Sequence, residues 1–272
     1  MLGIPVLQPE FVPAGRGHVI DRMVRRTPFY YGWVVLSAAA SSLFVRNAAA
    51  SLTLAVFIYP ISQDLNWSRT LIAGAASVGG LAASVASPFV GWACDKYGVR
   101  VVLTLSILML GLSTVSLAWA TVPVVFYLAY GIGRVIFSSS VQIGSSVAVS
   151  RWFVRRRGRA TGILFLSHSV GMVVFPLLAG FIIRARDWQE AWIFLGVLVW
   201  IGALAPVSFL IRQSPEAVGI PLEGDEEGHS QDDAQALSVP DDLSWTLREA
   251  MRTPTLWLLS GATGFLFLLQ SG

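Results

Sequence analysis

Residues 91–100 read GWACDKYGVR and separate two long apolar runs of the chain. Gly91, Asp95, Lys96, Gly98 and Arg100 fit the pattern G-x-x-x-D-K-x-G-x-R. The glycines permit a tight turn and a close approach of helices. An aspartate near a helix end can pair with basic residues or with a helix N-terminus. An ordinary charged turn is the less favoured interpretation, because all five positions match within one short loop.

Apolar segments of membrane-spanning length flank this loop and continue along the chain. Of 272 residues, 54% are hydrophobic and 13% charged, whereas a soluble domain carries about 25% charged residues. Apolar blocks of about 20 residues can cross a hydrocarbon core about 30 Å thick, and these blocks lack the alternation of β-barrel strands. We therefore expect an all-α polytopic protein of the lipid bilayer. The predicted spans are 31–61, 70–93, 99–120, 122–149, 160–183, 191–211 and 256–272.

The chain divides into four predicted parts. Residues 1–30 form an N-terminal tail, 31–211 a six-helix transmembrane half, 212–254 a central loop and 255–272 a seventh, incomplete helix. The acidic stretch EGDEEGHSQDD in the central loop is predicted to be disordered. Residues 241–254 are predicted to form a short amphipathic helix on the membrane surface. Because the chain stops inside an apolar run, we interpret it as truncated.

The distribution of basic residues predicts the orientation. Of 19 lysines and arginines, 14 lie on the side of the N-terminus, three on the other side and two inside the spans. Basic loops stay in the cytosol, so we expect a cytosolic N-terminus in the cell (plasma or inner) membrane. The net charge of +3 reflects these loops and is weak evidence for nucleic acid. The single cysteine, Cys94, excludes an internal disulfide and gives no metal-ligand spacing.

Two arginines, Arg46 and Arg134, interrupt the first and fourth predicted spans. An arginine at mid-membrane costs about 2.5–3.5 kcal/mol, and every aspartate and glutamate lies in a predicted loop or tail. A bound organic anion would satisfy the guanidinium groups, whose fork suits a carboxylate. The alternative is a structural role, with bonds to backbone carbonyls or snorkelling to the interface. The polar neighbours predicted to share the site are Asn47, Ser138, Gln142 and His168.

His168 lies on the fifth predicted span between two serines. Histidine titrates near neutrality, so it could relay a proton if transport is proton-coupled. A neutral packing or hydrogen-bonding role is the more common one for such a residue, and we favour it.

The loop at residues 91–100 resembles the signature loop of the major facilitator superfamily. RWFVRRRGRATGILFLSHSVG (151–171), YGWVV (31–35) and LNWSRT (65–70) resemble its monocarboxylate and oxalate–formate branch, as do RQSPEAVGI (212–220) and LREAMRTPTLWLL (247–259). The resemblance implies twelve helices in two halves with a substrate site between them. It also implies that the signature loop acts in the conformational switch.

We therefore predict a secondary transporter of small organic anions, monocarboxylates foremost, that works by alternating access. A coupled proton or counter-anion is left open. No cofactor or enzymatic activity is expected, because there is no G-x-x-x-x-G-K-[ST] loop and no carboxylate accompanies Ser and His in the spans. One alternative is a superfamily member that moves another solute, such as a drug or a sugar-like compound. Another is a half-length protein that pairs with a second chain without transporting.

Overall fold

The helices follow the expected apolar segments closely. A computed structural model describes residues 30–153, 156–211 and 253–271. By contacts the chain splits into two units, Met1–Glu226 and Glu227–Gly272. The α-helices of the first unit are α2 (Gly32–Val45), α3 (Ser51–Asp64), α4 (Arg69–Tyr97), α5 (Val99–Ser116), α6 (Pro123–Val135), α7 (Val141–Trp152), α8 (Arg157–Ala185), α9 (Trp188–Val199) and α10 (Ala205–Leu210). Short 3₁₀ and π segments extend or join them: η1 (Arg46–Ala49), η2 (Leu117–Trp119), η3 (Ile136–Ser140) and η4 (Trp200–Leu204).

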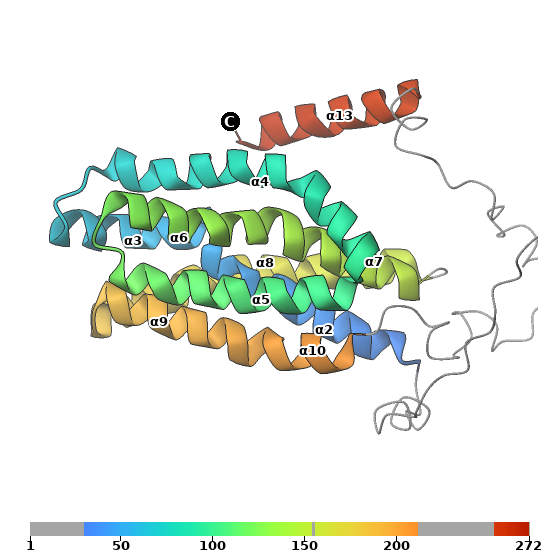
Figure 1. Cartoon of the computed structure of the whole chain (residues 1–272), viewed down its shortest axis with the longest axis horizontal. Helices are drawn as coiled ribbons and strands as arrows, with labels where there is room; N and C mark the ends of the chain where they lie inside the picture. The colour runs from blue at the N-terminus through green and yellow to red at the C-terminus, as the bar shows by residue number, and fades with distance from the viewer. Residues whose placement is uncertain (1–29, 154–155, 212–252, 272) are drawn as a thin grey trace, which may run out of the picture. The chain divides into compact units, whose positions relative to one another are not determined.

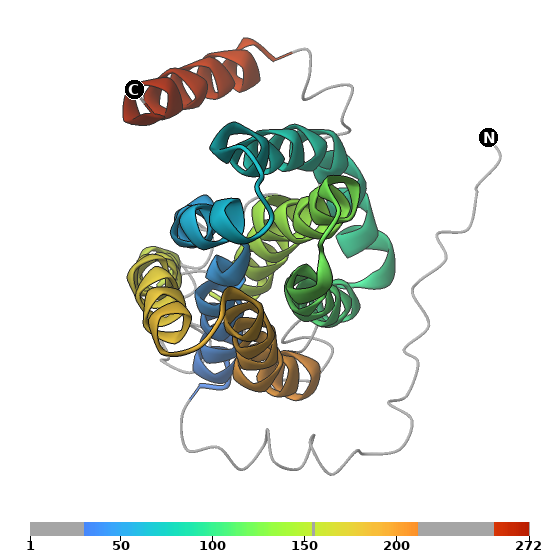
Figure 2. The same ribbon diagram turned by 90° about the vertical axis from the view of Figure 1, so that its left-hand side faces the viewer.

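These elements combine into six rods that lie side by side in the first unit (Figure 1). Over the described ranges, six stretches are long and apolar enough to cross a membrane: Gly32–Asp64, Arg69–Tyr97, Val99–Trp119, Pro123–Trp152, Arg157–Ala185 and Trp188–Leu210. Seen from the end in Figure 2, the rods form a bundle in which α4 packs along α6, α5 along α9, and α2 against α7 and α8. The predicted all-α membrane fold is therefore confirmed.

Local sequence explains where several helices begin and end. The Ser68 hydroxyl accepts a hydrogen bond from the Leu71 N–H at the start of α4, as an N-cap does. Pro123 opens α6, where its missing N–H costs nothing. Gly98 has a φ of 85° and separates α4 from α5. A residue with a Cβ is strained in that conformation, so the glycine permits the turn.

The first span is not one continuous helix. The 3₁₀ turn η1 follows α2, and Ala50 is extended before α3 begins. Polar side chains compete for the backbone there: Asn47 Nδ2 donates to the carbonyls of Leu43 and Phe44 at 3.1 and 3.0 Å. The Thr53 hydroxyl donates to the Asn47 carbonyl at 2.7 Å. The Asn47 carbonyl also accepts from the Ala50 N–H at 3.1 Å, so the side-chain bonds add to the backbone hydrogen bonds at the break.

The described part of the second unit is the helix α13 (Pro254–Ser271). It begins with a proline, a favoured first residue of a helix, and covers most of the predicted seventh span. It is not among the six stretches that meet the criteria for crossing a membrane, so its role as a span stays a prediction. The predicted N-terminal tail up to residue 29, the acidic stretch and the amphipathic helix up to residue 252 lie outside the described residues.

Candidate functional site

The break in the first span places two polar side chains inside the bundle. Arg46 and Asn47 begin η1 and are 4% and 0% exposed. Tyr130 of α6 donates its hydroxyl to the carbonyl of Ala49 at 3.2 Å, which satisfies another backbone group at the break. Non-helical backbone at membrane depth is tolerated where neighbouring groups satisfy it in this way. The break is thus held open by specific contacts with other helices.

Arg46 reaches across to the fourth span. One terminal nitrogen of its guanidinium donates to the carbonyl of Phe137 at 2.7 Å, and its central carbon lies 4.4 Å from the centre of the Phe137 ring. Phe137 belongs to η3, a π segment, and such segments occur frequently at functional sites. The Arg46 Nε is buried and has no hydrogen-bond partner in the described chain. Arg46 is therefore positioned by the protein but only partly satisfied by it.

Arg134 approaches the same ring from the end of α6. Its guanidinium carbon lies 4.8 Å from the centre of the Phe137 ring. No hydrogen bond or ion pair holds this guanidinium within the described ranges, and its buried Nε has no partner. The side-chain stem packs on Gly79 of α4, where an added Cβ would lie 2.8 Å from Arg134 Cβ. Two cations therefore share one aromatic ring, whose negative face attracts both.

Asn47 links the arginines to the fifth span. Its Nδ2 lies 3.3 Å from both Nδ1 and the carbonyl oxygen of His168 in α8. The ring of His168 is tilted against that of Phe137, with centroids 6.2 Å apart. Four of the predicted site residues thus meet around Phe137. We refer to Arg46, Asn47, Arg134, Phe137 and His168 as the Phe137 cluster.

The other two predicted site residues are placed less tightly. Ser138 lies in η3 and Gln142 in α7; both are partly buried, and neither side chain has a hydrogen-bond partner in the described part of the chain. Ser145, three residues beyond Gln142, shares a hydrogen bond of 2.9 Å with Ser42 of α2. A π segment inserts an extra residue into a turn. Residues beyond η3 therefore do not lie on the helix face that regular spacing from Arg134 would predict.

Phe137 is the residue that the sequence analysis missed. Its ring centre lies 4.4 and 4.8 Å from the two guanidinium carbons and 6.2 Å from the centre of the His168 ring, and its carbonyl accepts from Arg46. One signal was present in the sequence, because a residue three positions after Arg134 lies on the same side of a helix. An aromatic residue in an apolar span carries no polar group that would mark it as part of a binding site.

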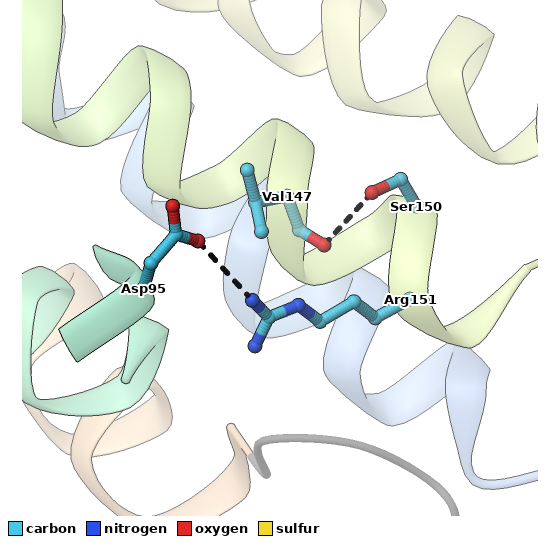
Figure 3. A network of polar contacts seen from close by, with 4 residues as sticks. All are labelled: Asp95, Val147, Ser150 and Arg151. Carbon is cyan, nitrogen blue, oxygen red and sulfur yellow. Dashed lines mark hydrogen bonds and ion pairs between the residues drawn. The ribbon is translucent and has the colours of Figure 1, made fainter. Parts of the chain in front are cut away.

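The signature loop is the second candidate site. Asp95 at the end of α4 forms an ion pair of 3.7 Å with Arg151 at the end of α7 (Figure 3). Figure 3 also shows the hydroxyl of Ser150, beside Arg151, donating to the Val147 carbonyl. Arg100 Nε donates to the Ser208 carbonyl of α10 at 2.8 Å. Asp95 thereby connects the end of the second span to the end of the fourth. Arg100 connects the start of the third span to the end of the sixth.

The remaining basic residue of the loop is used differently. The Lys96 ammonium lies over the rings of Trp92 and Tyr97, 4.6 and 5.3 Å from their centres. Gly91 has open space around its Cα on the same helix. Asp95 is 80% exposed at its side chain, so its pair with Arg151 is an interaction at the surface of this unit.

Comparison with known proteins agrees with the loop and the six-rod bundle. The profile of the Major Facilitator Superfamily matches residues 39–271. The chain belongs to the major facilitator superfamily. As a superfamily member it is similar to the MFS-type transporter YcxA of Bacillus subtilis, with 26% identity over 59% of this chain and 40% of the relative.

Two further superfamily relatives carry names that state a solute. The chain is 29% identical to the "Probable sulfoacetate transporter SauU" of Cupriavidus necator, over 61% of this chain and 36% of the relative. It is 25% identical to the "Probable anion transporter 6, chloroplastic" of Arabidopsis thaliana, over 82% of this chain and 43% of the relative. The matches of this chain span about two fifths of the length of these relatives.

Proposed function

We propose that this chain supplies the N-terminal half of a secondary transporter that moves small organic anions by alternating access. The observation that carries the proposal is the pair of guanidinium groups, Arg46 and Arg134, around one ring with no carboxylate beside them in the described chain. Monocarboxylates are the first class to test, because the sequence resembles the monocarboxylate and oxalate–formate branch. The excess of basic residues on one side supports a cell-membrane protein with a cytosolic N-terminus.

Electrostatics favour an anionic guest. The ion pairs of the described residues lie at helix ends, between Asp95 and Arg151 and between Arg186 and Glu190. Neither of these carboxylates neutralises the Phe137 cluster. An uncompensated buried charge is expensive, and the face of one aromatic ring offsets only part of that cost. A carboxylate could accept paired hydrogen bonds from a guanidinium fork and would neutralise the positive charge.

The relatives support an anion in general terms. Sulfoacetate and unspecified anions appear in the names of two of them, and the "Probable hexose phosphate transport protein" of Chlamydia trachomatis is 22% identical over 65% of this chain. A second candidate is a different solute, because the riboflavin transporter RibJ of Trypanosoma brucei is 30% identical over 46% of this chain. A half-length protein that pairs with another chain would lack the transport predicted below.

The signature loop has a separate proposed role. We propose that Gly91, Asp95, Lys96, Gly98 and Arg100 form a conformational switch at the cytosolic ends of the helices. The exposed pair between Asp95 and Arg151 can break at a small cost, because exposed ion pairs contribute about 0–1 kcal/mol. Such a contact suits a connection that must form and release in each transport cycle.

Arg134→Met in the full-length protein is the sharpest test. Methionine keeps an apolar stem against Gly79 and removes the charge together with the N–H donors of the guanidinium. Because the Arg134 guanidinium has no hydrogen-bond partner among the residues described, the variant should unfold at the same temperature as the parent or a higher one. Its KM for labelled lactate, formate or oxalate uptake into liposomes should rise about tenfold or more, since a hydrogen bond to a charged group contributes about 1.5–3 kcal/mol. Arg184→Met, at the exposed end of α8, is the matched control.

The opposite pattern would refute the anion site. If Arg134→Met lowers the unfolding temperature and leaves KM at the value of Arg184→Met, Arg134 is structural. If the parent takes up riboflavin and none of the three anions, the second candidate replaces the first.

A further inference from the structure

The orientation of the Asn47 side chain is settled by its surroundings. Three backbone carbonyls, those of Leu43, Phe44 and His168, lie 3.0–3.3 Å from its Nδ2. With the amide reversed, the Oδ1 atom would face three acceptors and make no hydrogen bond with them. The nitrogen must therefore point toward these carbonyls, which also places it 3.3 Å from His168 Nδ1.

This orientation determines the protonation of His168. An amide nitrogen donates and cannot accept. With Asn47 Nδ2 opposite it, His168 Nδ1 is best placed to present its lone pair, which leaves the ring proton on Nε2. A second proton on Nδ1 would place two N–H groups against each other. The Asn47 contact thus favours the neutral Nε2–H tautomer over both the other tautomer and the imidazolium.

The charges around His168 act in the same direction. The segment η1 packs against α8 and carries the charged side chain of Arg46. Arg134 of α6 contacts the same Phe137 ring as Arg46 and His168. The ring neighbours Asn47, Phe137 and the Leu43 carbonyl include no carboxylate. A third positive charge beside two guanidinium groups would be repelled. The Leu43 carbonyl also lies near the ring, and no hydrogen bond of His168 Nε2 is found within the described ranges.

We propose that His168 is a neutral hydrogen-bond donor of the anion site, held in its Nε2–H tautomer by Asn47 as a positioning residue. This proposal rests on the proposed function and makes it more specific: the anion meets two guanidinium donors and one imidazole donor. It assigns no proton relay to His168. The half-buried His168 ring belongs to the same Phe137 cluster as the two arginines, whose positive charge an anion would neutralise.

Nitrogen-15 spectra of histidine-labelled full-length protein test the tautomer directly. The difference between parent and His168→Gln spectra isolates the signals of His168. We expect an unprotonated Nδ1 and a protonated Nε2 throughout the range between about pH 5 and 8. In Asn47→Ala the same ring should populate both tautomers. A protonated Nδ1 in the parent at neutral pH would overturn the proposal, whether or not the protein transports anions.

Uptake kinetics test the donor. Glutamine places an amide N–H near the position of Nε2, whereas asparagine reaches only the position of Nδ1. His168→Gln should keep KM within about threefold of the parent, and His168→Asn should raise it about tenfold, as expected for a lost hydrogen bond to a charged group. Ser169→Ala, an exposed neighbour, should change neither KM nor the maximal rate.

The failures of the two proposals are distinguishable. If KM is unchanged in His168→Asn but rises in Arg134→Met, the anion site stands and the donor role of His168 is wrong. If His168→Gln removes the pH dependence of uptake, His168 relays protons and the proposal is overturned. The expected result is an unchanged pH profile in His168→Gln.

Discussion

Replacing Gly79 with alanine tests how tightly Arg134 packs against α4. An ideal Cβ at Gly79 would lie 2.8 Å from Arg134 Cβ and 2.9 Å from Arg134 Cγ. Carbon atoms in favourable contact lie about 3.5–4.0 Å apart, and these atoms are the part of the side chain nearest the backbone. The added methyl group must therefore push α6 away from α4 or force Arg134 out of its rotamer. Either change moves the guanidinium relative to Phe137.

The neighbouring residue provides the matched control, because an added Cβ at Gly80 meets nothing within 4 Å. Both substitutions gain up to about 1 kcal/mol from replacing a helical glycine, and this gain cancels in the comparison. What remains is the cost of overpacking at Gly79, about 1–3 kcal/mol. For a bundle of this size each kcal/mol shifts the unfolding midpoint by about 2–4 °C. Gly79→Ala should therefore unfold several degrees below Gly80→Ala.

Thermal unfolding of both variants in one detergent measures the midpoint, and liposome uptake measures KM. We expect KM to rise several-fold in Gly79→Ala and to stay at the parent value in Gly80→Ala, because binding depends on where the guanidinium lies. Equal midpoints would refute the close contact between Gly79 and Arg134. A lower midpoint with an unchanged KM would refute the reasoning that links this contact to the anion.

Two further predictions concern other contacts of the bundle. In Gly171→Ala an ideal Cβ would meet Asn47 Nδ2, whereas at Gly162 of the same helix it meets nothing within 4 Å. The unfolding midpoint of Gly171→Ala should therefore be several degrees below that of Gly162→Ala. Equal midpoints would contradict the packing of α8 on η1. Asp95→Asn breaks a pair whose members are 80% and 32% exposed, so the midpoint should move by less than about 4 °C; a larger loss in parallel with Arg151→Met would show that the pair stabilises the resting fold.

Much of the fold could be predicted because membrane spans are local in sequence. The predicted second span, 70–93, lies within α4, Arg69–Tyr97, and the third, 99–120, ends one residue beyond η2. Length and hydropathy are sufficient to locate such segments, since each must cross the same hydrocarbon thickness. The break at η1 was not predicted, because it depends on bonds from Asn47, Thr53 and Tyr130 to backbone carbonyls.

The candidate site was predictable in part. Arg46 and Arg134 stood out because charged residues inside apolar spans are costly, and the structure brings both to one ring. Phe137 did not stand out, because an aromatic residue in a membrane span is common. Ser138 and Gln142 were expected to share the site with Arg134, but the π segment η3 changes the helical register between Arg134 and Gln142. Whether any of these residues binds a substrate stays a prediction.

By itself, the sequence determined the membrane class, the span positions and the presence of two arginines inside apolar spans that hold no carboxylate, because these follow from composition and local order along the chain. Only the tertiary structure decided that Arg46 and Arg134 share the ring of Phe137 and that Asn47 faces His168. Residues 46 and 137 are 91 positions apart, and residues 47 and 168 are 121 apart. Contacts of this kind arise from helix packing and from irregular backbone at η1 and η3, which no local pattern encodes.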